Sequence, residues 1–215
     1  MNILVIGNEH NGQECREKFG AEHTWLQASS HQEAQLHLPQ AEVIFDFVPE
    51  TPKGLQIYAN KIVFLNTTLI SLSTFTKDHS VTGARFFGFC GLPTFLNRES
   101  LEVSVVQEGD VAGLQEICGR LNTKYALVAD TVGMVTPRII CMIINEAYYT
   151  VAEGTATRSD IDLAMKLGTN YPYGPFEWAH RIGLKLVYEV LAAVHLATRD
   201  ERYLICPLLK QEAGC

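Results

Sequence analysis

Short apolar runs alternate with longer polar segments over residues 1–130 of the chain. The first run, NILVIG, is rich in β-branched residues and is closed by Gly7, which is typical of a buried parallel strand. Helical patterns lie between such runs, so this part of the chain has the βαβ order of an α/β domain. We expect strands at residues 2–7, 23–27, 43–48, 61–66, 102–107 and 125–129, and helices at 13–19 and 109–121.

From Thr136 onward the apolar spacing becomes helical. Thr136 can cap a helix whose first position is a proline, where the missing N–H group costs no hydrogen bond. Capping and glycine signals continue to the end of the chain. We expect helix starts at Pro137, Ser159 and Pro175, and left-handed helix ends at Gly154 and Gly168. The sequence therefore predicts an α/β protein, with a Rossmann-like parallel sheet domain at 1–130 and a small all-α C-terminal domain at 131–215.

Four segments of the second half resemble one protein family in their order and spacing. They are DTVGMVTPR (130–138), INEA (144–147), SDIDLAMKLG (159–168) and NYPYGPFEWAHRIG (170–183). Together they are similar to the carboxy-terminal domain of the 3-hydroxyacyl-CoA dehydrogenases. The resemblance implies an NAD-binding-type domain at 1–130 and a helical dimerisation domain at 131–215. It also implies a homodimer that uses NAD to oxidise a 3-hydroxyacyl-CoA or a related hydroxy acid, with an acyl-CoA as the small-molecule substrate.

Composition and charge exclude several classes of protein. Apolar residues make up 47% of the chain, but stretches such as IICMII are far shorter than the roughly 20 residues of a membrane span. Met1 leads directly into a strand-like run without a signal peptide, so we expect a cytoplasmic protein without a membrane partner. The six cysteines form no CxxC pair, which argues against a metal site and a disulfide framework. A net charge of −7 without a Lys/Arg cluster argues against nucleic-acid binding.

The turn after the first predicted strand keeps part of a dinucleotide-binding motif. A G-x-G-x-x-G turn lets backbone amides at a helix start approach a pyrophosphate. Here Gly7 and Gly12 hold the first and third glycine positions, and Glu9 holds the second, where its charge would repel phosphate unless the side chain turns away. The acidic residue that would hold the ribose is replaced at the second strand by Gln27. The alternative is that both glycines merely shape a strand-to-helix turn in a domain that has lost its cofactor.

Members of the family remove the 3-hydroxyl proton with a histidine, which a glutamate orients, while Ser and Asn side chains contact the substrate. An ungapped comparison of ARFFGFCGLP with the family's R-F-x-G-x-H-F-F-N-P places Cys90 at the histidine and Glu102 at the glutamate. Thr68 falls on the serine and keeps its hydroxyl. Pro137 falls on the asparagine, and Thr136 beside it is a candidate replacement.

Three hypotheses about function follow from these substitutions. The first is a reduced dehydrogenase with a degenerate active site, in which Cys90 is a poor base because a neighbouring carboxylate raises a thiol pKa. The second is a non-catalytic homologue that acts as a binding or regulatory dimer, with Cys90 a buried filler and Glu102 a solvent-facing strand residue. Glu9, Cys90 and Pro137 favour this second hypothesis, as does the connection between residues 50 and 63, which is shorter than in the family. The third is an acyl-CoA enzyme of another class with Cys90 as nucleophile, for which the sequence offers no activating base.

Overall fold

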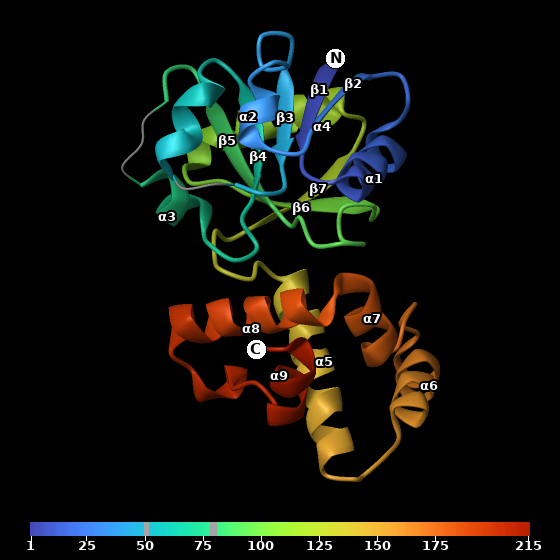
Figure 1. Ribbon diagram of the computed structural model, residues 1–215. Coiled ribbons are helices and arrows are strands. Elements are labelled where there is room, and N and C mark those ends of the chain that lie inside the picture. The colour runs from blue at the N-terminus through green and yellow to red at the C-terminus, as the bar shows by residue number, and fades with distance from the viewer. Residues whose placement is uncertain (50–51, 78–80) are drawn as a thin grey trace. The chain divides into compact units, whose positions relative to one another are not determined.

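The computed structural model describes residues 1–49, 52–77 and 81–215. Its contacts divide the chain into two compact units, Met1–Met134 and Val135–Cys215 (Figure 1). The first unit is an α/β domain and the second is helical, which confirms the predicted fold class. The division falls just after the boundary predicted at residues 130 and 131.

The described residues of the first unit form a seven-stranded sheet. Its strands are β1 (Asn2–Ile6), β2 (Thr24–Ala28), β3 (Val43–Asp46), β4 (Ile62–Asn66), β5 (Arg85–Phe89), β6 (Ser100–Ser104) and β7 (Lys124–Val128). They lie in the order β2-β1-β3-β4-β5-β6-β7, and neighbouring strands run parallel except for β5 and β6, which are antiparallel. The carboxyl ends of β1 to β5 therefore share one edge of the sheet, the edge at which such sheets bind ligands.

Two strands differ from the sequence prediction. The prediction did not include β5, and it placed β6 too late in the chain, at 102–107. A glycine weakens the strand pattern of β5, but Gly88 has a packing reason, because a β-carbon there would collide with the hydroxyl groups of Thr67 and Ser104. In β6 the buried residues Leu101 and Val103 flank Glu102, so the alternation begins before the predicted start.

Apolar side chains cover both faces of the sheet. On one face, α1 (Glu9–Phe19) and α4 (Val111–Arg120) pack against a cluster in which the rings of Phe19, Phe45 and Phe64 stack at 4.9 and 4.7 Å. The other face is covered by shorter helices. These are α2 (His31–Ala34), the 3-10 helix η1 (Pro52–Tyr58) and α3 (Leu72–Thr76). A further 3-10 helix, η2 (Glu108–Asp110), leads into α4. The result is the three-layer arrangement expected of a Rossmann-like domain.

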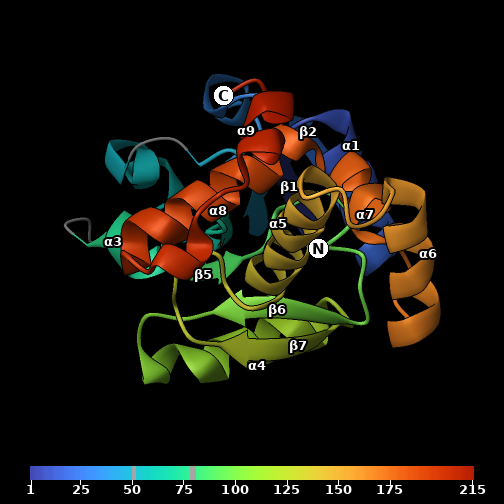
Figure 2. The same ribbon diagram turned by 90° about the horizontal axis from the view of Figure 1, so that it is seen from below.

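The second unit is a bundle of helices. They are α5 (Thr136–Ala152), α6 (Arg158–Thr169), α7 (Pro175–Ile182), α8 (Leu184–Thr198), the 3-10 helix η3 (Glu201–Tyr203) and α9 (Pro207–Ala213). Helix α5 lies among α7, α8 and α9, and α6 lies at the edge of the bundle (Figure 2). The core is formed by apolar residues of α5 and α8, including Ile140, Ile144, Val187, Val190 and Val194.

The start of α7 agrees with the sequence prediction, whereas the start of α5 and the limits of α6 do not. Helix α5 begins at Thr136 and its N-cap is Val135, so the cap predicted at Thr136 and the first position predicted at Pro137 lie one residue too late. Helix α6 is capped by Thr157, whose side chain accepts from the N–H of Asp160, so the start predicted at Ser159 was wrong. Gly168 lies inside α6, and the left-handed end is Asn170 (φ 54°). Among residue types, Asn is second only to Gly in tolerating this left-handed conformation. Gly154 adopts the same conformation after α5 (φ 73°), as predicted.

Candidate active site

The glycine-containing turn joins β1 to α1 at the ligand-binding edge of the sheet. Asn8 caps α1: its side chain accepts from the N–H of Asn11 at 3.0 Å, and the Asn11 side chain accepts from the N–H of Asn8 at 2.9 Å. This reciprocal pair fixes the direction of the helix start. The backbone N–H groups of Glu9 and His10 are the first two of the helix, and such groups have no acceptor within the helix. They are the amides available to a phosphate.

Gln27 braces this turn from the neighbouring strand. Its amide Nε2 donates to the carbonyl oxygens of Gly7 (2.9 Å) and Asn8 (3.2 Å). Gly12 allows this contact, because a β-carbon at Gly12 would collide with Gln27 Oε1. Gly12 thus has the role of the third glycine of the motif, which is close packing of helix and strand. The structure places Gln27 against the turn itself, so its assignment to the ribose stays a prediction.

The turn keeps two of the three glycine positions of a dinucleotide-binding motif. Gly7 and Gly12 keep the short path between strand and helix, and Glu9 is exposed at the surface instead of being packed into the turn. An exposed glutamate can turn away from a phosphate, which removes most of the charge repulsion expected from the sequence. Gly7, Glu9 and Gly12 would therefore surround a pyrophosphate if NAD binds here.

The carboxyl end of β4 is organised by Asn66, which the sequence analysis did not single out. Its Oδ1 accepts from Thr68 Oγ1 (2.7 Å), from the N–H of Thr68 (3.3 Å) and from the N–H of Gly91 (3.0 Å). Its Nδ2 donates to the carbonyl oxygen of Phe47 (3.1 Å). One amide side chain thus connects the ends of β3, β4 and β5. One sequence signal for this role is the place of Asn66 at the end of a buried apolar run.

The three predicted catalytic residues, Thr68, Cys90 and Glu102, lie together at the end of β5. The Cys90 thiol is within hydrogen-bond reach of the Thr68 side chain and close enough to Glu102 for their charges to interact. The antiparallel register pairs Phe89 with Val103, so the next pair outward is Cys90 with Glu102. Thr68 and Cys90 are buried, and Glu102 is partly exposed.

Burial makes the Cys90 thiol unreactive. The residue is 3% exposed, and burial raises the pKa of Cys90 to about 12, with a further upward contribution from the charge of Glu102. A thiol with this pKa is neutral at physiological pH, and neither a base nor a nucleophile is available from it. The hypothesis of Cys90 as nucleophile has no support in this geometry.

The segment after Cys90 is attached to α1 through a buried glutamate that the sequence analysis also missed. Glu14 Oε1 accepts from the N–H of Thr94 at 2.8 Å, and burial raises the pKa of Glu14. Thr94 has a positive φ of 74°, a strained conformation for a β-branched residue. Glu14 therefore holds α1 against the segment that follows Cys90.

The family-like segments of the second unit have structural roles. Asp162 caps α7: its carboxylate oxygens accept from the N–H groups of Phe176 (2.8 Å) and Glu177 (3.2 Å). Asn145, in INEA, is buried and bonds the backbone of Leu204 and Cys206, both at 2.9 Å. These contacts explain why the segments occur together.

Thr136 and Pro137 are the first two residues of α5, in the second unit. Pro137 is buried and Thr136 is partly exposed. Both residues belong to the helical unit, and their position relative to Thr68, Cys90 and Glu102 of the first unit is not defined. The suggestion that Thr136 replaces the lost asparagine therefore stays a prediction.

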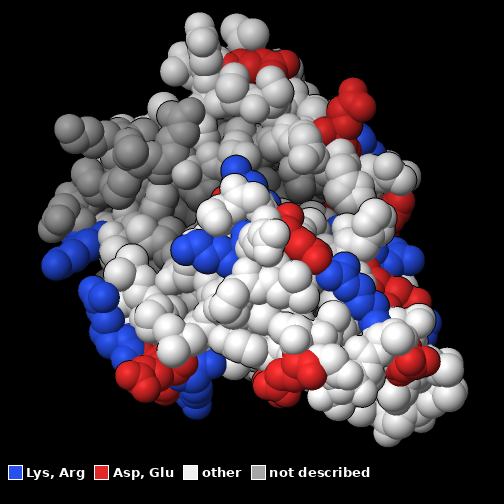
Figure 3. Space-filling model, turned by 60° about the horizontal axis from the view of Figure 1, so that its bottom comes forward, with Lys and Arg blue, Asp and Glu red and all other residues white. Residues whose placement is uncertain are grey.

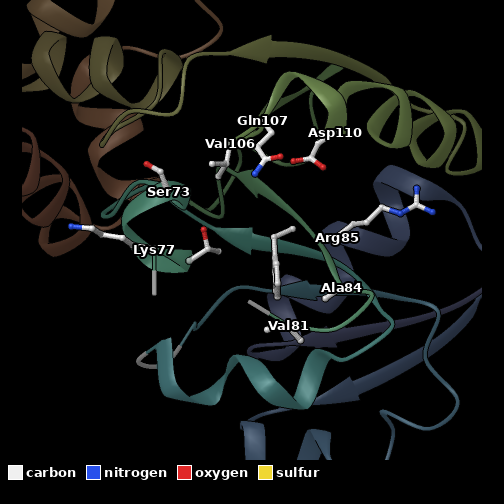
Figure 4. Close-up of a pocket in the computed structure, with 10 residues that line it drawn as sticks. Ser73, Lys77, Val81, Ala84, Arg85, Val106, Gln107 and Asp110 are labelled. Carbon is white, nitrogen blue, oxygen red and sulfur yellow. The ribbon is translucent and has the colours of Figure 1, made fainter. Parts of the chain in front are cut away.

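A surface cavity of about 570 Å³ lies elsewhere in the first unit, between α3, the start of β5 and η2 (Figure 4). Of the described residues that line it, none belongs to the predicted site. Lys77 and Arg85 point away from each other rather than into a common space (Figure 4). The cavity therefore has no focus of charge that would select an anionic ligand.

Other kinds of site find no support in the part of the chain that the structure describes. There, no three His, Cys, Asp or Glu side chains gather as metal ligands would, and no helix is long and apolar enough to cross a membrane. Five of the six cysteines are buried and Cys215 is exposed, all without disulfide bonds. Where residues are described, the face in Figure 3 carries Lys and Arg side chains interspersed with Asp and Glu.

Comparison with known proteins places the second unit clearly. Residues 133–213 match the model of the 3-hydroxyacyl-CoA dehydrogenase C-terminal domain. A 3-hydroxyadipyl-CoA dehydrogenase of Escherichia coli is 43% identical over 86 residues, which are 40% of this chain and 18% of that protein. A 3-hydroxybutyryl-CoA dehydrogenase of Clostridioides difficile is 31% identical over 166 residues, 77% of this chain and 58% of that protein. The chain thus spans less than two thirds of these relatives.

The fold extends the likeness to the whole chain. The crystal structure of an (S)-3-hydroxybutyryl-CoA dehydrogenase from Ralstonia eutropha matches 99% of this chain and 93% of its own, with a TM-score of 0.75 and 21% identity. At this identity the match establishes the fold of both units and does not establish the reaction.

Proposed function

The chain belongs to the 3-hydroxyacyl-CoA dehydrogenase family, and we propose that it is an NAD-dependent oxidoreductase with a degenerate active site, acting on a 3-hydroxyacyl-CoA or a related hydroxy acid. The observation that carries the proposal is the gathering of Thr68, Cys90 and Glu102 at the end of β5, in the unit that also bears the glycine-containing turn.

Oxidation of a 3-hydroxyl group removes a proton from the hydroxyl oxygen and a hydride from the carbon that bears it, and NAD, when bound, supplies the hydride acceptor. The chain has to supply the proton acceptor. Because Cys90 is neutral, Glu102 is the member of the cluster that can take the proton. Thr68, fixed by its bond to Asn66 Oδ1, would orient the substrate oxygen. A carboxylate is a weaker base than the imidazole of the family, so we expect slow turnover.

A calorimetric titration with NADH tests the cofactor part of this proposal without a choice of substrate. Saturable binding in the micromolar range supports it. No binding at millimolar NADH contradicts it and favours the second candidate.

The second candidate is a non-catalytic homologue that acts as a binding or regulatory dimer. The buried Cys90 favours it, since a thiol with a pKa of about 12 replaces the base of the family. Under this candidate the first unit is a retained scaffold. Multiple turnovers of any 3-ketoacyl-CoA with NADH, lowered about tenfold or more in Glu102→Ala, would exclude it.

A homodimer is part of both candidates. Helix α6 has no buried residue among those described, and it exposes Leu163 (55%) and Leu167 (78%) one turn apart. Two leucines on one face of an amphipathic helix gain free energy when they are covered. We propose that a second copy of the chain covers this face of α6, because no other described helix of the unit covers Leu163 and Leu167. The cytoplasmic location expected from the sequence stays a prediction.

A further inference from the structure

Strand β2 ends beside the glycine-containing turn but offers no side chain to a ribose. Ala28 pairs with Ile6, and its carbonyl oxygen accepts from the N–H of Gly7 at 2.9 Å. In dinucleotide-binding sheets an acidic side chain at this point accepts hydrogen bonds from the ribose hydroxyls. Ala28 is buried and apolar, and Gln27 holds the turn through its Nε2 while its Oε1 is buried against Gly12. With Gln27 in this position, an acceptor for the ribose would come from another part of the chain.

Glu33, in the first turn of α2, brings a carboxylate back to the end of β2. Its Oε2 accepts from both the backbone N–H and the hydroxyl group of Ser29, each at 2.7 Å. Ser29 directly follows Ala28, so the carboxylate lies next to the strand end. The backbone and then the side-chain hydrogen bond of Ser29 hold the pKa of Glu33 below its usual value, and the group is fully exposed. The charge is therefore fixed in place and open to a ligand.

This contact differs from an ordinary helix cap. Ser30 is the N-cap of α2 and accepts from the N–H of Glu33 at 3.3 Å. In a capping box the third residue bonds the backbone of the N-cap itself, whereas Glu33 bonds the residue before it. Within residues 1–49, 52–77 and 81–215, no donor is bonded to the second oxygen, Oε1.

A buried network holds this segment against the sheet. His31 Nε2 lies 2.8 Å from Asp46 Oδ2, and the Tyr58 hydroxyl donates to the same oxygen at 2.7 Å. Asp46 is the last residue of β3 and pairs with Ile6, the residue before the glycine-containing turn. Because His31 and Glu33 belong to the same helical turn, the network fixes the position of the Glu33 carboxylate relative to the turn.

We propose that the Glu33 carboxylate accepts hydrogen bonds from the ribose hydroxyls of the dinucleotide and makes this chain select NAD over NADP. A carboxylate accepts both hydrogens of a 2′,3′-diol, while it repels a 2′-phosphate. In other dinucleotide-binding domains an acidic residue at the end of β2 binds the ribose, and in this chain Glu33 of α2 would take that role. This inference rests on the proposed function, because it needs a dinucleotide at the turn.

Calorimetric titrations with NADH and with NADPH test it in the full-length chain and in variants. For the wild type, NADH should bind more tightly than NADPH. In Glu33→Gln the dissociation constant for NADH should rise about tenfold, the cost of one charge-assisted hydrogen-bonded contact. Glu108→Gln is the matched control, since Glu108 is also exposed but belongs to η2, near β6 at the other end of the sheet. Glu33→Lys should reverse the preference, a gain of NADPH binding that misfolding cannot produce.

The outcomes separate this inference from the proposed function. If the wild type binds neither nucleotide, the proposed function fails and the inference with it. If the wild type binds NADH and both Glu33 variants keep its affinity and preference, the inference alone is wrong. A lower preference for NADH in both variants, with Glu108→Gln unchanged, supports it.

Discussion

Cys90 directly follows the last residue of β5, and its thiol lies close enough to Glu102 of the antiparallel neighbour β6 for their charges to interact. In this arrangement a carboxylate lies beside a group that it cannot activate, because its charge raises the pKa of the thiol further. The same arrangement would orient and charge an imidazole. The cluster therefore keeps a carboxylate that could orient an imidazole, and it lacks the imidazole.

Replacing Cys90 with histidine should raise turnover. The imidazole would stand beside Glu102 and supply a base with a pKa near neutrality, so we expect an increase of about tenfold or more in kcat for NADH-linked reduction of a 3-ketoacyl-CoA. The control is Cys90→Ala, which should leave turnover unchanged, since a neutral thiol contributes no proton transfer. A loss of activity in Cys90→Ala would show that the thiol takes part.

The buried thiol should also be protected from alkylation. With a pKa of about 12, the buried Cys90 stays protonated at pH 8, whereas Cys215 is exposed and should react with iodoacetamide first. In the unfolded chain the Cys90 thiol ionises near pH 8.5, so folding loses free energy as pH rises above about 8.5. Peptide mapping after short exposure measures this difference. Equal labelling of both cysteines in the folded protein would contradict the burial argument.

Loss of the Asn66 side chain should destabilise the first unit. Asn66→Ala removes four hydrogen bonds and leaves the N–H groups of Thr68 and Gly91 without their acceptor, which should cost about 2–4 kcal/mol of unfolding free energy. Urea denaturation measures it. Asn97→Ala, an exposed position with a side-chain bond to Glu17, is the control and should cost under about 1 kcal/mol. An equal loss of unfolding free energy in the two variants would contradict the proposal that Asn66 organises the ends of β3, β4 and β5.

The second unit should depend on Asp162. Asp162→Ala removes the cap from α7 and should lower the unfolding free energy of the unit by about 1–2 kcal/mol. Glu153→Ala, an exposed residue after α5, is the control. Thermal unfolding followed by circular dichroism compares them. A melting temperature for Asp162→Ala equal to that of the control would show that the cap is dispensable.

Charges on α6 should separate the proposed dimer. Leu163→Glu with Leu167→Glu would place two like charges on the face that a second copy covers, and the mass in solution should fall to that of one chain. Leu204→Glu, another exposed leucine of the unit at 51% exposure, is the control and should leave the mass unchanged. Light scattering after size-exclusion chromatography gives the mass. A wild type that is already monomeric would refute the dimer.

The sequence predicts the parts of the fold that local pattern determines. Apolar runs locate β1 and β4, because a buried strand requires several adjacent apolar residues. Pro175 locates the start of α7, because proline lacks an N–H group and is favoured in the first turn of a helix. Helices α2 and α3 are too short to show a period, and tertiary contacts hold them in place.

For the site, the comparison with the family found Thr68, Cys90 and Glu102, which the structure brings together. The contact of Asp46 with His31 joins residues on different elements, and that of Glu14 with Thr94 joins residues far apart in sequence. Spacing along the chain carries no signal for either contact. Such pairs become visible when the strand order is known, because the sheet edge brings the ends of distant segments together.

We propose that the chain carries out hydride transfer with Glu102 as proton acceptor. The most direct measurement is NADH consumption at 340 nm with a panel of 3-ketoacyl-CoA thioesters, for the wild type and for Thr68→Ala and Glu102→Ala. We expect slow but repeated turnover in the wild type and a decrease of about tenfold or more in each variant. Turnover that is absent with every thioester, or unchanged in both variants, would contradict this role of Glu102.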